Sequence, residues 1–351
     1  MKSRTWAVAL VVMGALLLSA CSDDSEPAGE SETATATSTA TTSTEATATE
    51  AATEAVAGAF PVTIEHKYGS TTIEAEPQRV VSVGYQDHDF LLSLGVIPVG
   101  VREWWGEKPY ATWVWAEEAL GDAQPVVLNT PELDIEAVAA LNPDLIVGFY
   151  SGITEDEYEL LSAIAPTVTQ PDTYVDYGMP WDEQLLETGR AVGRAAEAEA
   201  LLEETEAQFA ALRAEHPEFE GKTALIGGPN TDGSFWVYGP EDPRSRLLAA
   251  LGFEYPEAVA NAATDSFYFS LSAEQGALLE SDVFVRILNS GVTEADLPPT
   301  PVWDQLKMVQ EGRVYTTSFD ADVIGAFSFS SPLSLPWGLT QLAESLAPIA
   351  Q

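Results

Sequence analysis

Short apolar strands alternate with short helices along most of this chain, and one long helical stretch interrupts the alternation. Apolar runs such as RVVSVG at 79–84, LIVGF at 145–149 and DVFVRIL at 282–288 are typical of strands buried on both faces of a sheet. Helical patterns with short links separate these runs, which is the pattern of parallel βαβ units. The sequence therefore predicts an α/β fold of two lobes with mostly parallel sheets.

The first lobe is expected to begin with a small hairpin formed by residues 62–65 and 71–74. Its other strands are expected at 79–84, 97–101, 125–128, 145–149 and 167–170, and its helices at 87–94, 134–141 and 155–164. Strands of the second lobe are expected at 223–227, 234–238, 253–255, 282–288 and 313–316, and helices at 243–251, 272–279, 302–309 and 336–346.

Residues 182–215 interrupt the alternation with a sequence rich in Ala, Glu and Leu, whose apolar residues follow helical spacing up to Pro217. At 1.5 Å per residue, about thirty helical residues extend about 45–50 Å, which is longer than one lobe needs. We therefore expect one rigid helix over 181–216 that joins a lobe at 60–180 to a lobe at 217–351. A surface helix within a single domain is the alternative.

The first twenty-one residues have the composition of a secretory signal. Lys2 and Arg4 precede an apolar run at 6–18, which is too short to span a bilayer comfortably and is followed by small residues. The sequence LSAC at 18–21 also resembles the bacterial lipobox, which implies that Cys21 becomes the lipid-modified first residue of the mature protein. The alternative is an ordinary signal peptide followed by a thiol.

Residues 22–59 are predicted to form a disordered tether. The segment has eight acidic residues, no basic residue and no aromatic residue, and ten threonines lie between positions 33 and 53. Such a composition cannot bury enough apolar surface to offset the entropy lost on ordering. A self-repelling spacer of this kind would hold a folded body away from a membrane.

The charge of the chain excludes several kinds of partner. The full sequence has 15 basic and 55 acidic residues, and residues 60–351 alone have 13 basic and 47 acidic residues. This excess of acid argues against nucleic acid and against peripheral binding to anionic lipid. The single cysteine excludes an intramolecular disulfide or a Cys-rich zinc site, and the three histidines lie too far apart in sequence to suggest a metal site.

Six segments of the body, in the same order, resemble the substrate-binding proteins of ferric-siderophore ABC importers. They are PQRVVSVG (77–84), LSLGVIPVGV (92–101), DIEAVAALNPDLIVG (134–148), LLSAIAPTV (160–168), LSAEQGALLESDVFV (271–285) and WDQLKMVQEGRVYTT (303–317). The resemblance covers about residues 60–349. It implies two Rossmann-like lobes bridged by one helix, with a shallow ligand cleft between the lobes.

The resemblance also implies what such a protein does. It would be a monomeric lipoprotein at the extracytoplasmic face of a bacterial cell membrane, with no covalent cofactor and no catalytic residue. Its cargo would be a ferric siderophore, and its partner would be an ABC permease dimer with its ATPase. Parallel strands bring their following loops to one edge of a sheet, where ligands of such folds bind.

Aromatic and cationic residues follow several of these strands and are our candidates for the cleft. A ferric siderophore needs flat apolar surfaces and a few donors for its exposed oxygens. The candidate ligand-binding residues are Tyr85, Arg102, Trp104, Trp105, Tyr150, Trp236, Tyr238, Arg244 and Arg246. Tyr150 matches the tyrosine that the family has after the corresponding strand, whereas Asn129 stands where hydroxamate receptors of the family have an arginine.

The segment REWWGEKPYATWVW at 102–115 holds four tryptophans, which would be unusual on a surface that meets no ligand. We expect Trp104 or Trp105 to face the cleft, whereas Trp113 and Trp115 could equally pack in the core. Arg102 could instead pair with a neighbouring glutamate, and either Arg244 or Arg246 could pair with nearby acids. Asp87 and His88 are expected to begin a helix, with Asp87 capping its amides at the surface.

Glu136 and Glu274 occupy equivalent places in the two similar helix starts DIEAVAAL and LSAEQGALL. By resemblance, such a pair meets arginine pockets on the permease. The alternative is a pair of ordinary carboxylates favoured at helix amino termini.

Three other functions remain open from the sequence. The ligand could be cobalamin, haem or a quaternary amine, since aromatic faces also attract cations. A glycosidase would use two of the many carboxylates, but no G-x-S-x-G, P-loop or GxGxxG motif follows a predicted strand. A surface adhesin would suit the tether. We therefore predict a binding protein that is not an enzyme.

Overall fold

The computed structural model describes residues 60–128, 132–263 and 268–351. The predicted signal peptide with Cys21, the predicted tether at 22–59 and the position of Asn129 lie outside the described residues. Within the described ranges, no helix combines the length and apolar character that a membrane span requires.

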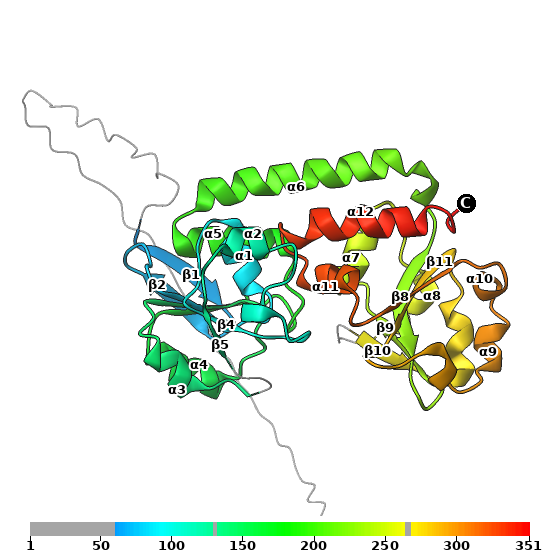
Figure 1. The fold of residues 1–351 in the computed structure, drawn as a ribbon, viewed down its shortest axis with the longest axis horizontal. Helices are drawn as coiled ribbons and strands as arrows, with labels where there is room; N and C mark the ends of the chain where they lie inside the picture. Colours follow the sequence, from blue (N-terminus) through cyan, green and yellow to red (C-terminus); the bar gives the residue numbers. More distant parts are fainter. Residues whose placement is uncertain (1–59, 129–131, 264–267) are drawn as a thin grey trace, which may run out of the picture. The chain divides into compact units, whose positions relative to one another are not determined.

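The first lobe is a parallel α/β unit with a hairpin added to it (Figure 1). Its five-stranded sheet has the order β5-β4-β3-β6-β7, and all its neighbouring strands are parallel. The hairpin strands are β1 (Val62–His66) and β2 (Gly69–Ile73), and the sheet strands are β3 (Val80–Ser82), β4 (Gly100–Arg102), β5 (Val126–Leu128), β6 (Leu145–Gly148) and β7 (Thr167–Thr169). The helices are α1 (Asp87–Ser93), the 3₁₀ turn η1 (Pro109–Ala111), α2 (Glu117–Leu120), α3 (Ile135–Ala140) and α4 (Glu155–Ser162).

Both faces of this sheet are covered, as the continuous apolar strands predict. Along β6, Leu145 and Val147 enter the core on one face, whereas Ile146 enters the core on the other. The period of two residues along a strand sends successive side chains to opposite faces. The apolar runs therefore specify a sheet sandwiched between helical layers.

The second lobe has a mixed sheet with the order β10-β9-β8-β11-β12. Strands β8, β11 and β12 are parallel, whereas β9 is antiparallel to both β8 and β10. The strands are β8 (Ala224–Pro229), β9 (Phe235–Tyr238), β10 (Tyr268–Leu271), β11 (Val283–Leu288) and β12 (Val314–Ser318). The helices are the 3₁₀ turn η2 (Pro217–Phe219), α7 (Pro243–Ala250), α8 (Glu257–Ala260), the 3₁₀ segments η3 (Ala273–Leu279) and η4 (Glu294–Asp296), α9 (Pro301–Asp304), α10 (Lys307–Gln310), α11 (Asp322–Phe329) and α12 (Ser334–Leu346).

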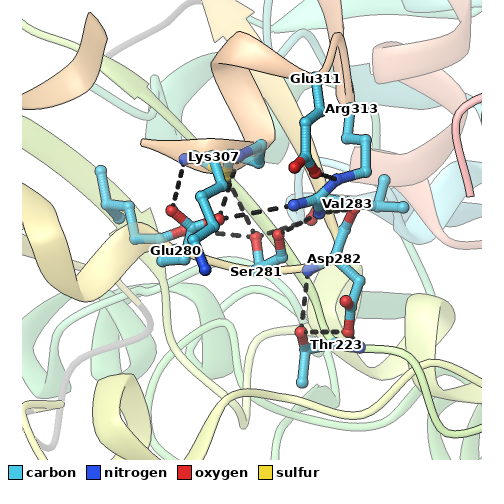
Figure 2. Close-up of polar contacts among 10 residues, drawn as sticks. Thr223, Glu280, Ser281, Asp282, Val283, Lys307, Glu311 and Arg313 are labelled. Atoms are coloured by element: carbon cyan, nitrogen blue, oxygen red, sulfur yellow. Dashed lines mark hydrogen bonds and ion pairs between the residues drawn. The ribbon is translucent and has the colours of Figure 1, made fainter. Parts of the chain in front are cut away.

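Polar side chains tie together the amino ends of the three parallel strands of this sheet, as Figure 2 shows. Just before β11, the Asp282 carboxylate accepts hydrogen bonds from the backbone N–H of Thr223 at 2.8 Å and from its hydroxyl at 2.9 Å. Arg313, just before β12, donates to the carbonyl of Ser281 at 2.7 Å. The three strands therefore start at one level, and their carboxyl ends form a common rim at the opposite edge.

The single helix expected over 182–215 is wrong, because the chain breaks after Val192. Helix α5 (Trp181–Val192) ends at Gly193, whose φ of 72° is left-handed, and α6 (Ala195–Glu215) follows. Glycine is the residue that most easily ends a helix in this conformation. Ala198 of α6 belongs to the core of the first lobe and Phe209 to the core of the second, so α6 contributes to both.

Two further expectations about helices need correction, and one helix was not expected. The segment η3 is a 3₁₀ helix, with Ser272 capping its first turn. The helix expected at 302–309 is divided into α9 and α10, because Leu306 is extended between them. Helix α11 was not expected, because residues 323–329 are all buried and show no polar face from which a helical period can be read.

Helix α11 contributes to two apolar clusters at once. Ile324 and Phe327 belong to the core of the second lobe, whereas Phe329 packs with Trp113 and Trp115. The Trp113 and Trp115 rings are stacked with their centroids 5.2 Å apart, and both are buried. Of the two alternatives that the sequence leaves for these tryptophans, the structure shows the core.

Asp89 lies buried beside this cluster and accepts two hydrogen bonds. Trp115 Nε1 donates to Asp89 Oδ2 at 2.7 Å, and the Ser331 hydroxyl donates to the same oxygen at 2.9 Å. Burial raises the pKa of Asp89 to about 7, against the effect of these hydrogen bonds. Burial lowers the pKa of the adjacent His88 to about 4, so His88 is neutral and lies in the interior rather than at the surface.

These values predict how stability depends on pH. Between about pH 4, where an unfolded aspartate titrates, and about pH 7, the folded state binds one proton more at Asp89 than the unfolded state does. The contribution of Asp89 to the free energy of unfolding therefore falls as the pH rises through this range. Asp89→Asn keeps an acceptor for Trp115 and Ser331 but cannot ionise.

We expect the free energy of unfolding of Asp89→Asn to exceed that of the wild type by about 1–3 kcal/mol at pH 8 and to approach it near pH 4. Urea unfolding at both pH values measures this difference. Asp122→Asn, at an exposed position, is the control and should leave the profile unchanged. An equal loss of stability in Asp89→Asn at both pH values would contradict the raised pKa of Asp89.

Candidate ligand-binding cleft

A cavity of about 470 Å³ lies at the carboxyl ends of the parallel strands of the second lobe. Its lining comes from residues on or just after β8, β9, β10, β11 and β12, from the start of α7, and from the segment that follows β4 in the first lobe. The lining residues are Trp104, Asn230, Trp236, Tyr238, Arg244, Tyr268, Ser270, Asn289 and Phe319. This is where α/β sheets generally bind ligands, because the loops after parallel strands converge there.

Trp104 forms the aromatic wall that the first lobe supplies. Its ring stacks on Tyr85 with centroids 5.7 Å apart and an angle of 27°. Trp105 meets it edge-on at 4.5 Å, and Tyr150 and Phe329 lie at 5.4 and 5.8 Å. Neighbours on several sides fix the indole plane, so Trp104 presents a rigid surface to the cavity.

A buried ion pair forms the floor of the cavity. Arg244 Nη1 donates to the two carboxylate oxygens of Asp242 at 2.9 and 3.2 Å, and the Arg244 backbone N–H donates to the same carboxylate at 2.8 Å. Arg244 Nε donates to the Ser328 hydroxyl at 3.2 Å. Burial raises the pKa of Asp242, and Arg244 opposes this effect. We assign the ionised carboxylate, because its partners are all N–H donors.

Aromatic rings lie close to the Arg244 guanidinium, and Tyr150 also interacts with it. The central carbon of the guanidinium lies 4.3 Å from the Tyr238 ring centroid and 5.7 Å from that of Trp104. Burial raises the pKa of Tyr238 to about 12 and also raises that of Tyr150. Burial lowers the pKa of Arg244, but the neighbouring Asp242 and Tyr238 raise it overall. At neutral pH the phenols therefore carry no charge, and Arg244 is positive.

The structure places the predicted site residues in four different locations. Trp104, Trp236, Tyr238 and Arg244 line the cavity. The Trp104 ring contacts the rings of Tyr85, Trp105 and Tyr150, which are not among the lining residues. Arg102 packs against the face of Tyr85, with its guanidinium carbon 4.3 Å from the ring centroid. It also donates to the carbonyls of Val83 and Ser151 at 3.4 Å.

Arg246 lies elsewhere. It donates to Glu241 at 2.7 Å and to the carbonyl of Gly178 at 3.1 Å, and it lines a different pocket, beside Trp181 and Phe209. Of the two arginines at the start of α7, Arg244 is therefore the one that reaches the cavity.

The expected role of Asp87 as the cap of α1 is wrong. Gln86 is the residue before the helix, and no side chain caps its amides there. The Asp87 carboxylate instead accepts hydrogen bonds from the backbone N–H groups of Phe149 at 2.6 Å and Tyr150 at 3.1 Å. Burial raises the pKa of Asp87 to about 7, against these hydrogen bonds. Asp87 thus fixes the turn after β6 that positions Tyr150.

Five lining residues were not among the predicted candidates. They are Asn230, Tyr268, Ser270, Asn289 and Phe319. Asn230, Asn289 and Phe319 directly follow β8, β11 and β12, which are the positions to which the strand-end rule points. Tyr268 and Ser270 lie on β10, which was not predicted, and nothing in the sequence pattern points to them.

Two other expectations concern metals and docking. Within the described ranges, no group of three or more His, Cys, Asp or Glu side chains could hold a metal ion. Glu136 and Glu274 are both exposed in the first turns of α3 and η3, one in each lobe.

Comparison with known proteins identifies the family. Residues 80–321 match the sequence model of the family described as periplasmic binding protein. The chain is 26% identical over 258 residues to the Fe(3+)-citrate-binding protein YfmC of Bacillus subtilis (strain 168), in an alignment that covers 73% of this chain and 78% of the relative.

Solved structures agree with this match. The crystal structure of a periplasmic solute binding protein from Mycobacterium smegmatis str. MC2 155 superposes with a TM-score of 0.71 at 34% identity and covers 83% of this chain and 99% of that one. Streptococcus pneumoniae TIGR4 PiaA in complex with ferrichrome gives a TM-score of 0.73 at 26% identity, covering 82% and 98%. The resemblance seen in the sequence is thus confirmed, and the chain belongs to the periplasmic binding protein family.

Proposed function

We propose that this protein captures a ferric siderophore in the cavity and delivers it to an ABC importer permease. The observation that carries the proposal is the aromatic lining of the cavity, which combines the rigid ring of Trp104 with Trp236 and Tyr238 of β9. A cavity of about 470 Å³ is within the range typical of small-molecule sites. Relatives named for ferric citrate and for ferrichrome support an iron chelate as the cargo.

The same geometry disfavours a quaternary amine. Such a ligand binds over open aromatic faces, but Arg244 already lies over Tyr238 and within reach of Trp104. Cobalamin and haem remain as alternative ligands, to be separated from ferric chelates by the measurement below. Because the family consists of binding proteins, we propose binding without turnover.

Trp104 gives a direct test. Titration of the soluble body, residues 58–351, with ferric chelates should quench tryptophan fluorescence saturably, because a coloured iron complex would sit against Trp104. Trp104→Ala should weaken binding about ten-fold or more, and Trp104→Phe should retain part of the affinity because it keeps a flat apolar ring.

Trp303→Phe is the matched control, because Trp303 lines a pocket away from the cavity, between Phe235 and Arg286, and should leave the affinity unchanged. Saturation by haem or cobalamin alone would refute the siderophore proposal. Unaltered binding in Trp104→Ala would place the ligand elsewhere.

We further propose that Glu136 and Glu274 dock the permease. Both are exposed carboxylates in the first turn of a helix, and surface charge pairs of this kind chiefly set orientation and association rate. The hydrogen bonds of Glu274 with its own backbone N–H and with Ser272 lower the pKa of Glu274, which favours its charged form.

The double variant Glu136→Ala/Glu274→Ala should lose most ligand-stimulated ATPase activity of the reconstituted importer, while its ligand affinity stays unchanged. Glu155→Ala/Glu257→Ala is a matched control, since both residues are also exposed in the first turn of a helix, one in each lobe. Equal activity of the two double variants would show that Glu136 and Glu274 act only on their own helices.

We also propose that Cys21 carries a lipid and holds the protein at the outer face of the cell membrane. The lipobox-like LSAC sequence supports this, together with the tether composition that follows it.

Cys21→Ala should move the protein from the membrane fraction into the culture medium or periplasm, because one residue supplies the anchor. Cell fractionation with immunoblotting measures this, and Ser22→Ala is the control. Incorporation of a labelled fatty acid into Cys21→Ala to the same extent as into the wild type would contradict lipidation.

A further inference from the structure

The charge balance of the cavity points to the class of chelate it takes. We propose that the site selects ferric chelates whose net charge is zero or positive and discriminates against anionic chelates such as ferric citrate. This inference rests on the proposed function and refines it. The two relatives named for ferric citrate and for ferrichrome differ in this respect, so family membership does not decide the matter.

The first step concerns the cavity lining. Among the described lining residues, Arg244 alone is cationic, and the others offer aromatic rings, amides or hydroxyls. Within the described lining, Arg244 is therefore the residue that could attract an anion.

The second step is that Arg244 is already neutralised. Asp242 is fully buried against it, and both of its carboxylate oxygens accept hydrogen bonds from Arg244 Nη1. The pair as a whole adds no net charge, while its fixed dipole and the N–H groups can still meet the oxygens of a neutral complex. An anionic chelate entering the cavity would lose its hydration without gaining an uncompensated cation.

The third step concerns the other cations near the cavity. Arg102 is buried against the Tyr85 ring and is not among the lining residues. Arg246 pairs with Glu241 at 2.7 Å, and Lys108 pairs with Asp322 at 3.2 Å. Arg286 pairs with Glu294. Residues 60–351 have 47 acidic and 13 basic residues, so the long-range field also repels anions.

The test uses three chelates of different charge: ferrichrome, which is neutral, ferric ferrioxamine B, which is cationic, and ferric citrate, which is anionic. Affinities of the wild type are measured at pH 7.4 by calorimetry. We expect at least one of the first two to bind about ten-fold or more tightly than ferric citrate. Equal or tighter binding of ferric citrate would overturn the inference but leave the proposed function intact. Binding of none of the three would count against both.

Asp242→Asn then changes the charge without removing Arg244. Asparagine can still cap α7, so the helix start is preserved. Because the variant leaves Arg244 uncompensated, its affinity for ferric citrate should rise about ten-fold or more relative to that for ferrichrome. Glu241→Gln is the matched control, because it removes the same charge from the neighbouring residue, whose partner Arg246 lies outside the cavity.

The double variant Asp242→Asn/Arg244→Gln separates charge from shape. It should lose the affinity for ferric citrate that Asp242→Asn gains. A similar gain in Glu241→Gln, or no gain in a folded Asp242→Asn, would overturn the inference. Circular dichroism and thermal unfolding establish that each variant is folded.

Discussion

The packing of Trp113 against α11 is the contact on which the geometry of the cleft depends. A Cβ atom added at Gly325 would lie 2.7 Å from the Trp113 ring, so the indole lies directly on the helix backbone. Trp113 in turn contacts Trp105, which meets Trp104 edge-on. The orientation of the aromatic wall is thus transmitted through three indoles from a glycine in α11. Of the four tryptophans in fourteen residues, Trp104 lines the cavity, and the other three pack one against the next away from it.

Three buried carboxyl groups hold polar and aromatic groups of the structure in place through hydrogen bonds. Asp87 fixes the turn that carries Tyr150, Asp89 joins Trp115 to Ser331, and Asp242 holds Arg244 in place. Each is buried at a cost in solvation and is offset by specific donors. In so acidic a chain, these three carboxyl groups differ from the many exposed ones by being fully buried.

Much of the fold could be read from the sequence, because it is encoded locally. Apolar runs specified the parallel strands. The aspartate at the start of the helix expected at 134–141 is a typical cap, and the Asp134 carboxylate accepts from the backbone N–H of Ala137. The break at Gly193 was missed because the apolar spacing continues across it, although a glycine followed by a polar residue was a signal. Strand β10 was missed because it pairs with β9 at an edge of the sheet and alternates exposed with buried residues over only four positions.

The site was predictable to a smaller extent. The rule for parallel strand ends pointed to Trp104, which follows β4. Trp236 and Tyr238 lie within β9, which is antiparallel to β8, so this rule does not account for them. The pairing of Arg244 with Asp242 and the exclusion of Arg246 depend on side-chain directions at the start of α7, which a sequence pattern does not contain. The contacts of Asp87 and Asp89 likewise join residues that are far apart in the chain, so only the folded structure shows them.

Helix α6 has a consequence for how the protein unfolds. Its Ala198 end completes one lobe's core and its Phe209 end completes the other's, and α11 links the second core to the tryptophan cluster. Disruption of either core would uncover an apolar face of a helix that the other core also needs. The unfolding of one lobe is therefore coupled to that of the other. Residues 60–351 should melt in one calorimetric transition rather than as two independent domains.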